Sequence, residues 1–378
     1  MRGVSISVML MIHVLNNWLD DDSRWFLIVV RILTNTVAIN NFIFVSGLSY
    51  GFSWQLSKSK KLTNKEITNK NISKIIILGF IVLIFNLSNV LSHGSEFKEI
   101  WSWFILQTIT FMWILGLFFM KFSSKIRIIV AIILILTSKL ILDFLNSDNP
   151  ILEFFYFILF NKLDYNSPVF FLPFFLIGTV MGEKIQILSK LPDSHKNKIK
   201  NELKSWVSIG MILIFIGIIS GSYLTSNEIG WDYVGQLNLH PEINISGIPM
   251  FLVRVSYAWC FYTLGFILLI LSALYFIFDY KKKFAKRSIH PFELFGRYSL
   301  TVYLTHYIFF INSYALDHTV IMIPVIILFV LWWCLMKILE KYGKGKYSIK
   351  YVIGFGSKLI YNKYFEKEKN KRQKLAYS

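Results

Sequence analysis

The feature that most limits what this chain can fold into is the recurrence of apolar runs, each long enough to cross a lipid bilayer. A hydrocarbon core of about 30 Å needs roughly 20 mostly apolar residues per helix, and such runs recur between residues 3 and 339 of the 378. A span must satisfy its own backbone hydrogen bonds, and continuous apolar runs of this length do so as helices. The sequence therefore predicts an all-α polytopic membrane protein.

About ten of these runs have the length of a transmembrane helix. We predict spans at residues 3–19, 33–54, 75–91, 101–120, 128–144, 169–182, 206–224, 249–278, 298–314 and 320–339. Residues 25–54 are too many for one span, and Arg31 lies early in them, so we expect the first third along the outer interface. Residues 151–160 are too few for a span and fit a re-entrant or interfacial segment.

Lysine and arginine are concentrated in alternate loops, and this sets the predicted orientation. The formal net charge is +18, yet residues 225–248 contain no lysine or arginine and three acids, Glu228, Asp232 and Glu242. Because basic loops stay in the cytoplasm, both termini are predicted to be cytoplasmic, in a multi-pass protein of the cell membrane. Charge that follows the topology in this way gives no reason to expect a nucleic-acid partner.

Residues 1–340 are predicted to form a single transmembrane domain, and residues 341–378 a basic, aromatic cytoplasmic tail. The tail mixes lysines with tyrosines and phenylalanines. Such a segment can lie on the anionic inner leaflet, where basic residues gain electrostatically. A solvated tail fits the same composition.

Ionisable side chains inside the predicted spans are few, which makes them the first candidates for function. Arg2 and His13 are eleven residues apart, close to three helical turns, so both project from one face about 16 Å apart along the axis. In one interpretation Arg2 anchors the topology and His13 packs against a neighbouring helix. In the other, Arg2 is the cytoplasmic cation and His13 the deep imidazole of one site.

Three residues are candidates for the outer half of such a site. Arg254 lies near Tyr257 in the predicted span 249–278, and its charge either reaches the interface or points into a polar cavity. Trp231, in the outer loop, belongs either to the aromatic belt of the membrane interface or to a platform for a sugar.

Four short motifs occur in order along the chain. The first is the Arg-x10-His spacing of Arg2 and His13, and the second is an apolar run at residues 41–47 that ends in Ser-Gly. Residues 104–107 read Phe-Ile-Leu-Gln, and residues 296–306 read Gly-Arg-Tyr-Ser-Leu-Thr-Val-Tyr-Leu-Thr-His. Together they resemble the integral-membrane acyltransferase superfamily, which includes the acyltransferase-three family and the heparan-alpha-glucosaminide N-acetyltransferases.

The resemblance implies transfer of an acyl group, usually acetyl, from cytoplasmic acyl-CoA to a hydroxyl or amine at the outer face, with a carbohydrate as acceptor and no metal. The thioester would approach His13, whose imidazole, with an ordinary pKa of about 6.5, acts as general base or carries the acyl group. His306 either lines the same channel or ties its helix to a neighbour. The residues expected near the CoA phosphates are Arg2, Lys58, Lys60, Lys61, Lys281, Lys282 and Lys283.

The sequence departs from the family's patterns at two places. A lysine-rich stretch at residues 58–74 stands where acyltransferase-three proteins often have Arg-x-x-Arg, and no histidine lies between His13 and His93, where the heparan enzymes are expected to have one. We therefore expect a prokaryotic-type member with another acceptor. A secondary transporter is the alternative from another class, although the sequence shows no repeat pair and no acid deep in a predicted span.

Overall fold

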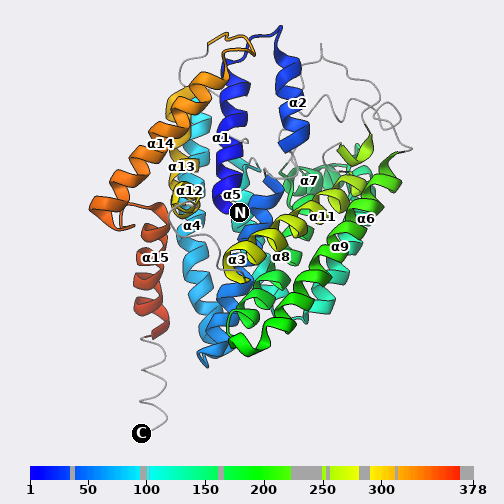
Figure 1. Cartoon of the computed structure of the whole chain (residues 1–378), viewed down its shortest axis with the longest axis vertical. Helices are drawn as coiled ribbons and strands as arrows, with labels where there is room; N and C mark the ends of the chain where they lie inside the picture. The colour runs from blue at the N-terminus through cyan, green and yellow to red at the C-terminus, as the bar shows by residue number, and fades with distance from the viewer. Residues whose placement is uncertain are drawn as a thin grey trace. The chain divides into compact units, whose positions relative to one another are not determined.

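The regular elements of the protein are helical throughout the part of the chain that the structure describes (Figure 1). The computed structural model describes residues 1–34, 39–93, 100–101, 103–160, 166–222, 249–252, 256–280, 290–310 and 314–366. Within these ranges there is no strand, and Leu19 and Leu316 form an isolated β-bridge. The all-α prediction is confirmed for this part of the chain.

The helices begin where the sequence supplies starting signals. Side-chain oxygens of Ser123, Ser167 and Ser256 accept hydrogen bonds from backbone N–H groups in the first turns of three of them, which satisfies donors that a helix start leaves open. The α-helices are α1 (Arg2–Trp18), α2 (Arg24–Thr34), α3 (Ile39–Ser59), α4 (Asn64–His93), α5 (Ile105–Phe119), α6 (Ser124–Leu145), α7 (Pro150–Leu159), α8 (Pro168–Leu188), α9 (Lys196–Ser222), α11 (Tyr257–Leu274), α12 (His290–Arg297), α13 (Ser299–Thr305), α14 (Met322–Gly343) and α15 (Ile349–Ile360).

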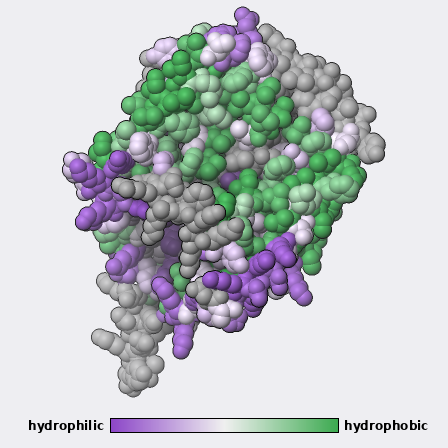
Figure 2. Space-filling view, in the orientation of Figure 1, coloured by the Kyte–Doolittle hydropathy of each residue, from purple (hydrophilic) through white to green (hydrophobic). Residues whose placement is uncertain are grey.

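Six helices of the described chain are long and apolar enough to cross a membrane: α4, α6, α8, α9, α14, and α11 with the π-helical turn Tyr275–Tyr280 that follows it. Their outward faces carry large apolar side chains, such as Phe80, Leu140 and Phe215, which are 63%, 67% and 64% exposed. Figure 2 shows hydrophobic residues over broad areas of one face. Water would oppose such surfaces and lipid does not, so the chain is a membrane protein.

These six helices are fewer than the ten or so predicted spans. Helices α1 and α5 have 17 and 15 residues, and the predicted span 298–314 contains the 7-residue α13 and a 3₁₀ turn, His306–Phe310. The long run at residues 25–54 is two helices, α2 and α3, and residues 151–160 coincide with the 10-residue α7. The placement of α2 and α7 at the interface stays a prediction.

The chain divides into two compact units. The first contains Met1–Val45, Ile135–Lys139 and Lys190–Tyr342, and the second contains Ser46–Leu134, Leu140–Ser189 and Gly343–Ser378. In the first unit α1 packs with α12 and α13, and α9 packs with α11. In the second unit α4 packs with α5 and α15, and α5 packs with α8.

Glycines bring α9 and α11 together in the first unit (Figure 1). A Cβ added to Gly217 would lie 2.7 Å from the backbone nitrogen of Tyr262 and 2.8 Å from the carbonyl oxygen of Ala258. A Cβ added to Gly265 would lie 2.5 Å from the carbonyl oxygen of Gly210. Small residues let helix backbones touch in a membrane, where dispersion and hydrogen bonding replace hydrophobic association.

We predict that Gly217→Ala lowers the thermal stability of the detergent-purified protein, because the new methyl group would push α11 away from α9. The matched control is Gly79→Ala in α4, where an added Cβ meets nothing within 4 Å. Both changes gain about 1 kcal/mol of helix propensity, so the difference between their melting temperatures reports the steric clash. Equal melting temperatures would contradict the close packing of α9 and α11.

Candidate functional site

The candidate site begins with α1 lying against the late part of the chain. A Cβ added to Gly3 would lie 1.9 Å from the carbonyl oxygen of Phe292, and one added to Gly296 would lie 3.3 Å from the backbone nitrogen of Gly3. The start of α1 therefore touches the backbone of α12. Only a residue without a Cβ permits this approach.

Ten residues farther along both segments, two histidines meet. The rings of His13, on α1, and His306, at the end of α13, have centroids 4.8 Å apart and an interplanar angle of 68°. The spacing from Gly3 to His13 equals that from Gly296 to His306, so the two segments run in the same direction. The structure thus brings together both residues that the sequence analysis singled out as catalytic candidates.

Aromatic side chains and one backbone carbonyl fix the orientation of the histidine rings. The ring centroid of Tyr307 lies 4.2 Å from that of His306 and 5.6 Å from that of His13. His306 is fully buried, and its Nδ1 donates a hydrogen bond to the carbonyl oxygen of Tyr303. A proton on Nδ1 leaves the lone pair of the neutral ring on Nε2, the nitrogen available for acid–base chemistry.

Helix α2 contributes the guanidinium group of Arg31, which contacts the C-terminal part of α1 just after His13. Arg31 Nη2 donates to Asn16 Oδ1 at 2.8 Å, and Arg24 Nη1 donates to the carbonyl oxygen of Asn16 at 3.0 Å. Asn16 lies three residues after His13, nearly one turn away. The sequence analysis noticed Arg31 but assigned it to the interface, and it gave no role to Asn16.

Backbone pairing ties the far end of α1 to the segment that follows the histidine pair. Asp20 N donates to Leu316 O at 3.0 Å, and Leu316 N donates to Trp18 O at 2.8 Å. Hydrogen bonds from the Thr319 side chain and backbone hold the pKa of Asp317 below its ordinary value. The segment is therefore held to α1 on both sides of His306.

A polar contact lies between the start of α1 and its histidine. Asn41 Nδ2, at the start of α3, donates to Ser5 Oγ at 2.8 Å, and both side chains are about 1% exposed. Ser5 lies between Arg2 and His13 along α1. The first part of the second motif therefore contacts the first motif directly.

The late motif also carries residues that anchor it to α14. Tyr298 Oη donates to Glu340 Oε2 at 2.8 Å, and the Arg297 guanidinium forms an ion pair with the same carboxylate. Arg297 also contacts Glu293 at 3.1 Å. The Gly-Arg-Tyr start of the motif thus positions the segment, whereas its histidine reaches the candidate site.

The remaining motif residues, in the second unit, serve packing. Ser46 Oγ accepts a hydrogen bond from Trp113 Nε1 at 2.9 Å, and a Cβ added to Gly47 would lie 2.2 Å from the carbonyl oxygen of Phe175. Gln107 Oε1 accepts a hydrogen bond from the side-chain amide of Asn86. Ser-Gly here joins α3 to its neighbours, a role that membrane helices commonly give to small residues.

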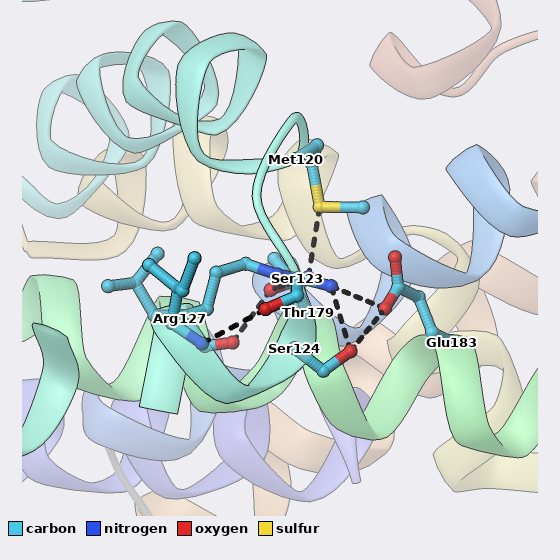
Figure 3. Close-up of polar contacts among 8 residues, drawn as sticks. Met120, Ser123, Ser124, Arg127, Thr179 and Glu183 are labelled. Carbon is cyan, nitrogen blue, oxygen red and sulfur yellow. Dashed lines mark hydrogen bonds and ion pairs between the residues drawn. The ribbon is translucent and has the colours of Figure 1, made fainter. Parts of the chain in front are cut away.

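The second unit also holds a buried ion pair, which the sequence analysis missed (Figure 3). Arg127 on α6 is 2% exposed and pairs with Glu183 on α8. Its Nη1 donates to Thr179 Oγ1 at 2.7 Å, and its Nη2 donates to Ser124 Oγ at 3.2 Å. The signal in the sequence is Glu183, a single acid at the end of the apolar run in α8, because an acid in such a position needs a partner.

The other candidates lie at the end of α3, on α11, or outside the described residues. Lys58, Lys60 and Lys61 lie at the end of α3 in the second unit. Tyr257 Oη donates to the carbonyl oxygen of Ser220 at 3.4 Å, which holds the start of α11 on α9. The candidates outside the described residues are Trp231, Arg254, Lys281, Lys282 and Lys283.

The comparison with known proteins identifies a family. A family model described as an acyltransferase domain, that of acyltransferase family 3, matches residues 1–339. No curated protein and no solved structure matches the chain. The matched range contains Arg2, His13, His306 and the whole late motif.

We predict that Glu183→Gln destabilises the protein by about 3–5 kcal/mol, because it leaves the buried Arg127 charge without its partner. Replacing both residues by methionine should recover most of the loss, since no buried charge then remains. Glu293→Gln, at the more exposed pair with Arg297, is the control and should cost less than about 1 kcal/mol. Chemical unfolding of the three variants measures the differences, and a loss at Glu183 no larger than the control would contradict the buried pair.

Proposed function

Because the chain belongs to the acyltransferase-3 family, we propose that it moves an acyl group, acetyl in the first instance, from cytoplasmic acyl-CoA to a hydroxyl or amine of a carbohydrate at the outer face. The family shows a membrane acyltransferase in general. The donor, the acceptor and the roles of individual residues are the additions made here.

The observation that carries the proposal is the His13–His306 pair, with ring centroids 4.8 Å apart. His13 lies about 16 Å from Arg2 along the axis of α1. A histidine that served only for packing would need one hydrogen-bond partner on a neighbouring helix. The imidazole of His306 and the ring of Tyr307 both face His13, and two imidazoles side by side are an arrangement suited to proton transfer.

The donor is proposed to lie along α1. CoA is polyanionic, so its phosphates favour the cytoplasmic surface and the guanidinium of Arg2. Lys58, Lys60, Lys61 and the lysines at 281–283 are further candidates for the same phosphates. The pantetheine arm would pass the Ser5–Asn41 contact and bring the thioester carbonyl to the histidine pair.

Two chemical routes fit the pair. In the first, an imidazole nitrogen removes the proton from the acceptor hydroxyl or amine, the acceptor atom bonds to the thioester carbonyl carbon, and the carbon–sulfur bond breaks. The departing CoA thiolate then takes the proton back from the imidazolium. In the second, a ring nitrogen of His13 bonds to the thioester carbonyl carbon, and the carbon–sulfur bond breaks to release the CoA thiolate. The acceptor oxygen or nitrogen then bonds to the same carbon as its bond to His13 breaks, and the proton of the acceptor passes to the thiolate.

The Arg31 side chain has a proposed role in either route. The thioester oxygen gains negative charge as the carbonyl carbon is attacked, and fixed cations or hydrogen-bond donors near such an oxygen lower the barrier. Arg31 is held one turn beyond His13 through Asn16. On the outer side, Arg254, Tyr257 and Trp231 remain the proposed contacts of the acceptor.

The direction of transfer depends on topology, for which we propose ten or so spans with both termini in the cytoplasm of the cell. The six long apolar helices account for part of this number. Helices α1, α3, α5 and the α13 segment are the proposed remainder. The support is the placement of basic residues, which favours the cytoplasm for both ends.

The catalytic proposal predicts that His13→Ala abolishes acyl transfer while acetyl-CoA binding persists. Loss of a general base typically lowers the rate by roughly 10² to 10⁴, whereas the phosphate contacts are distant from His13. The measurement is transfer of label from radioactive acetyl-CoA to carbohydrate in native membranes, paired with acetyl-CoA affinity of the purified variant. Near-normal turnover would remove His13 from the mechanism.

Two variants serve as controls for this measurement. Arg2→Gln should weaken acetyl-CoA binding instead, because it removes a phosphate contact but not the base. His195→Ala changes an exposed histidine between α8 and α9 and should leave both quantities unchanged. Wild-type protein without measurable acetyl-CoA binding would overturn the donor assignment itself.

The topology proposal predicts that Glu228→Cys reacts with an impermeant thiol reagent added to intact cells. Glu228 lies outside the described residues, in the loop with no basic side chain. Lys65→Cys, at the start of α4, should react only after the cells are opened. The reverse pattern would invert the topology and the direction of transfer together.

A further inference from the structure

Helix α15 carries an apolar stripe that is exposed in the described part of the chain. Val352, Phe355 and Leu359 lie three and four residues apart, on one face of the helix, and are 53%, 56% and 56% exposed. Tyr351 stacks on Phe355 with ring centroids 6.3 Å apart and is 45% exposed. An exposed stripe of this kind is costly in water.

A different face of α15 packs on α4 within the second unit. A Cβ added to Gly356 would lie 3.0 Å from Cδ1 of Ile77, and the Nζ of Lys70 lies 5.6 Å from the ring centroid of Tyr361. Tyr361, directly after α15, thus meets an earlier residue of α4 than Gly356 does, so the helices are antiparallel (Figure 1). Ser357 is buried on the same side.

The exposed stripe continues a surface that already faces lipid. Helix α4 is one of the six helices long and apolar enough to cross the membrane, and it exposes Ile76, Phe80 and Leu83 at 50%, 63% and 58%. Ile76 is next to Ile77, the residue that contacts α15. The stripe on α15 therefore lies beside apolar side chains that require acyl chains around them.

The third face of α15 is basic. At 100° per residue, Lys350 and Lys358 lie on either side of Gly354, opposite the junction of the two apolar faces, and both lysines are exposed. Lys363 follows in the π-helical turn Tyr361–Glu366. Residues 341–365 contain no aspartate or glutamate, and Glu366 ends the turn, so this surface has a net positive charge that favours anions.

We propose that α15 lies in the cytoplasmic membrane interface and binds anionic phospholipid. Val352, Phe355 and Leu359 insert among acyl chains, while Lys350, Lys358 and Lys363 contact the headgroup phosphates. Long lysine side chains keep their charge at the headgroups while their stems cover apolar surface. Basic residues at an anionic leaflet and apolar residues below it are the two contributions to interfacial binding. The proposal does not depend on acyl transfer.

The experiment places a fluorophore on two neighbouring residues of the full chain. Phe355→Cys and Gly354→Cys are each labelled in a background in which Cys260 and Cys334, the cysteines of the wild-type chain, are alanine. The proteins are reconstituted in vesicles of phosphatidylcholine alone, or with phosphatidylglycerol added. Quenching by spin-labelled acyl chains is compared with quenching by aqueous iodide.

The proposal predicts that the label at position 355 is quenched by the acyl chains, more strongly with phosphatidylglycerol, and that the label at 354 is quenched mainly by iodide. Replacing Lys350, Lys358 and Lys363 by glutamine should shift the equilibrium between membrane-bound and solvated α15. The solvated form should gain about fivefold per lysine. Raised salt should act in the same direction.

Three results would overturn the proposal. Iodide quenching at 355 equal to that at 354 would show a solvated helix. Self-quenching between labels at 355, unaffected by lipid, would show that a second copy covers the stripe. Equal acyl-chain quenching at 355 with and without phosphatidylglycerol would show that the helix does not recognise the anionic headgroup. This comparison uses the protein with its lysines intact, so it does not require a lysine variant to fold.

Discussion

The contact on which the candidate site depends is the backbone approach between Gly3 of α1 and Phe292 of α12. No side chain separates the two backbones there, and this sets how closely the segments run for the next ten residues. The same spacing then carries His13 to His306. A larger residue at Gly3 would move apart the segments that hold the two imidazoles, although it lies nearly three turns from them.

Lipid determines how the polar side chains of this protein are arranged. A membrane offers no water to an amide, hydroxyl or guanidinium group, so such a group gains by lying where another helix supplies a partner. Asn41 reaches Ser5, Arg31 reaches Asn16, and Arg127 reaches Glu183. The polar groups of the candidate site are therefore fixed by the same requirement that joins the helices.

The outer surface of the helices is apolar. Large apolar side chains point away from the protein on α4, α9 and α14, where a soluble protein would expose charge. Helix α15 has both kinds of surface, because its lysines follow one face and its apolar side chains the others. A helix of this composition has its lowest free energy where hydrocarbon and water meet.

The sequence by itself determined the all-α membrane class, the approximate position of most helices, and the two histidines as candidates. It could do so because span length and the rarity of intramembrane charge are local properties of the chain. The short α2 and α7 were likewise visible, since their apolar runs did not match one span. The resemblance to membrane acyltransferases came from motifs of the same local kind and is confirmed by the family match.

Only the tertiary structure decided which of these residues meet. The pairing of His13 with His306 joins segments almost three hundred residues apart, and nothing in the local pattern of either segment specifies the other. The same holds for Arg127, whose partner Glu183 is 56 residues away in the sequence, on α8. Helix periodicity fixes the face on which a side chain lies, whereas the neighbour of that face is fixed by packing between distant helices.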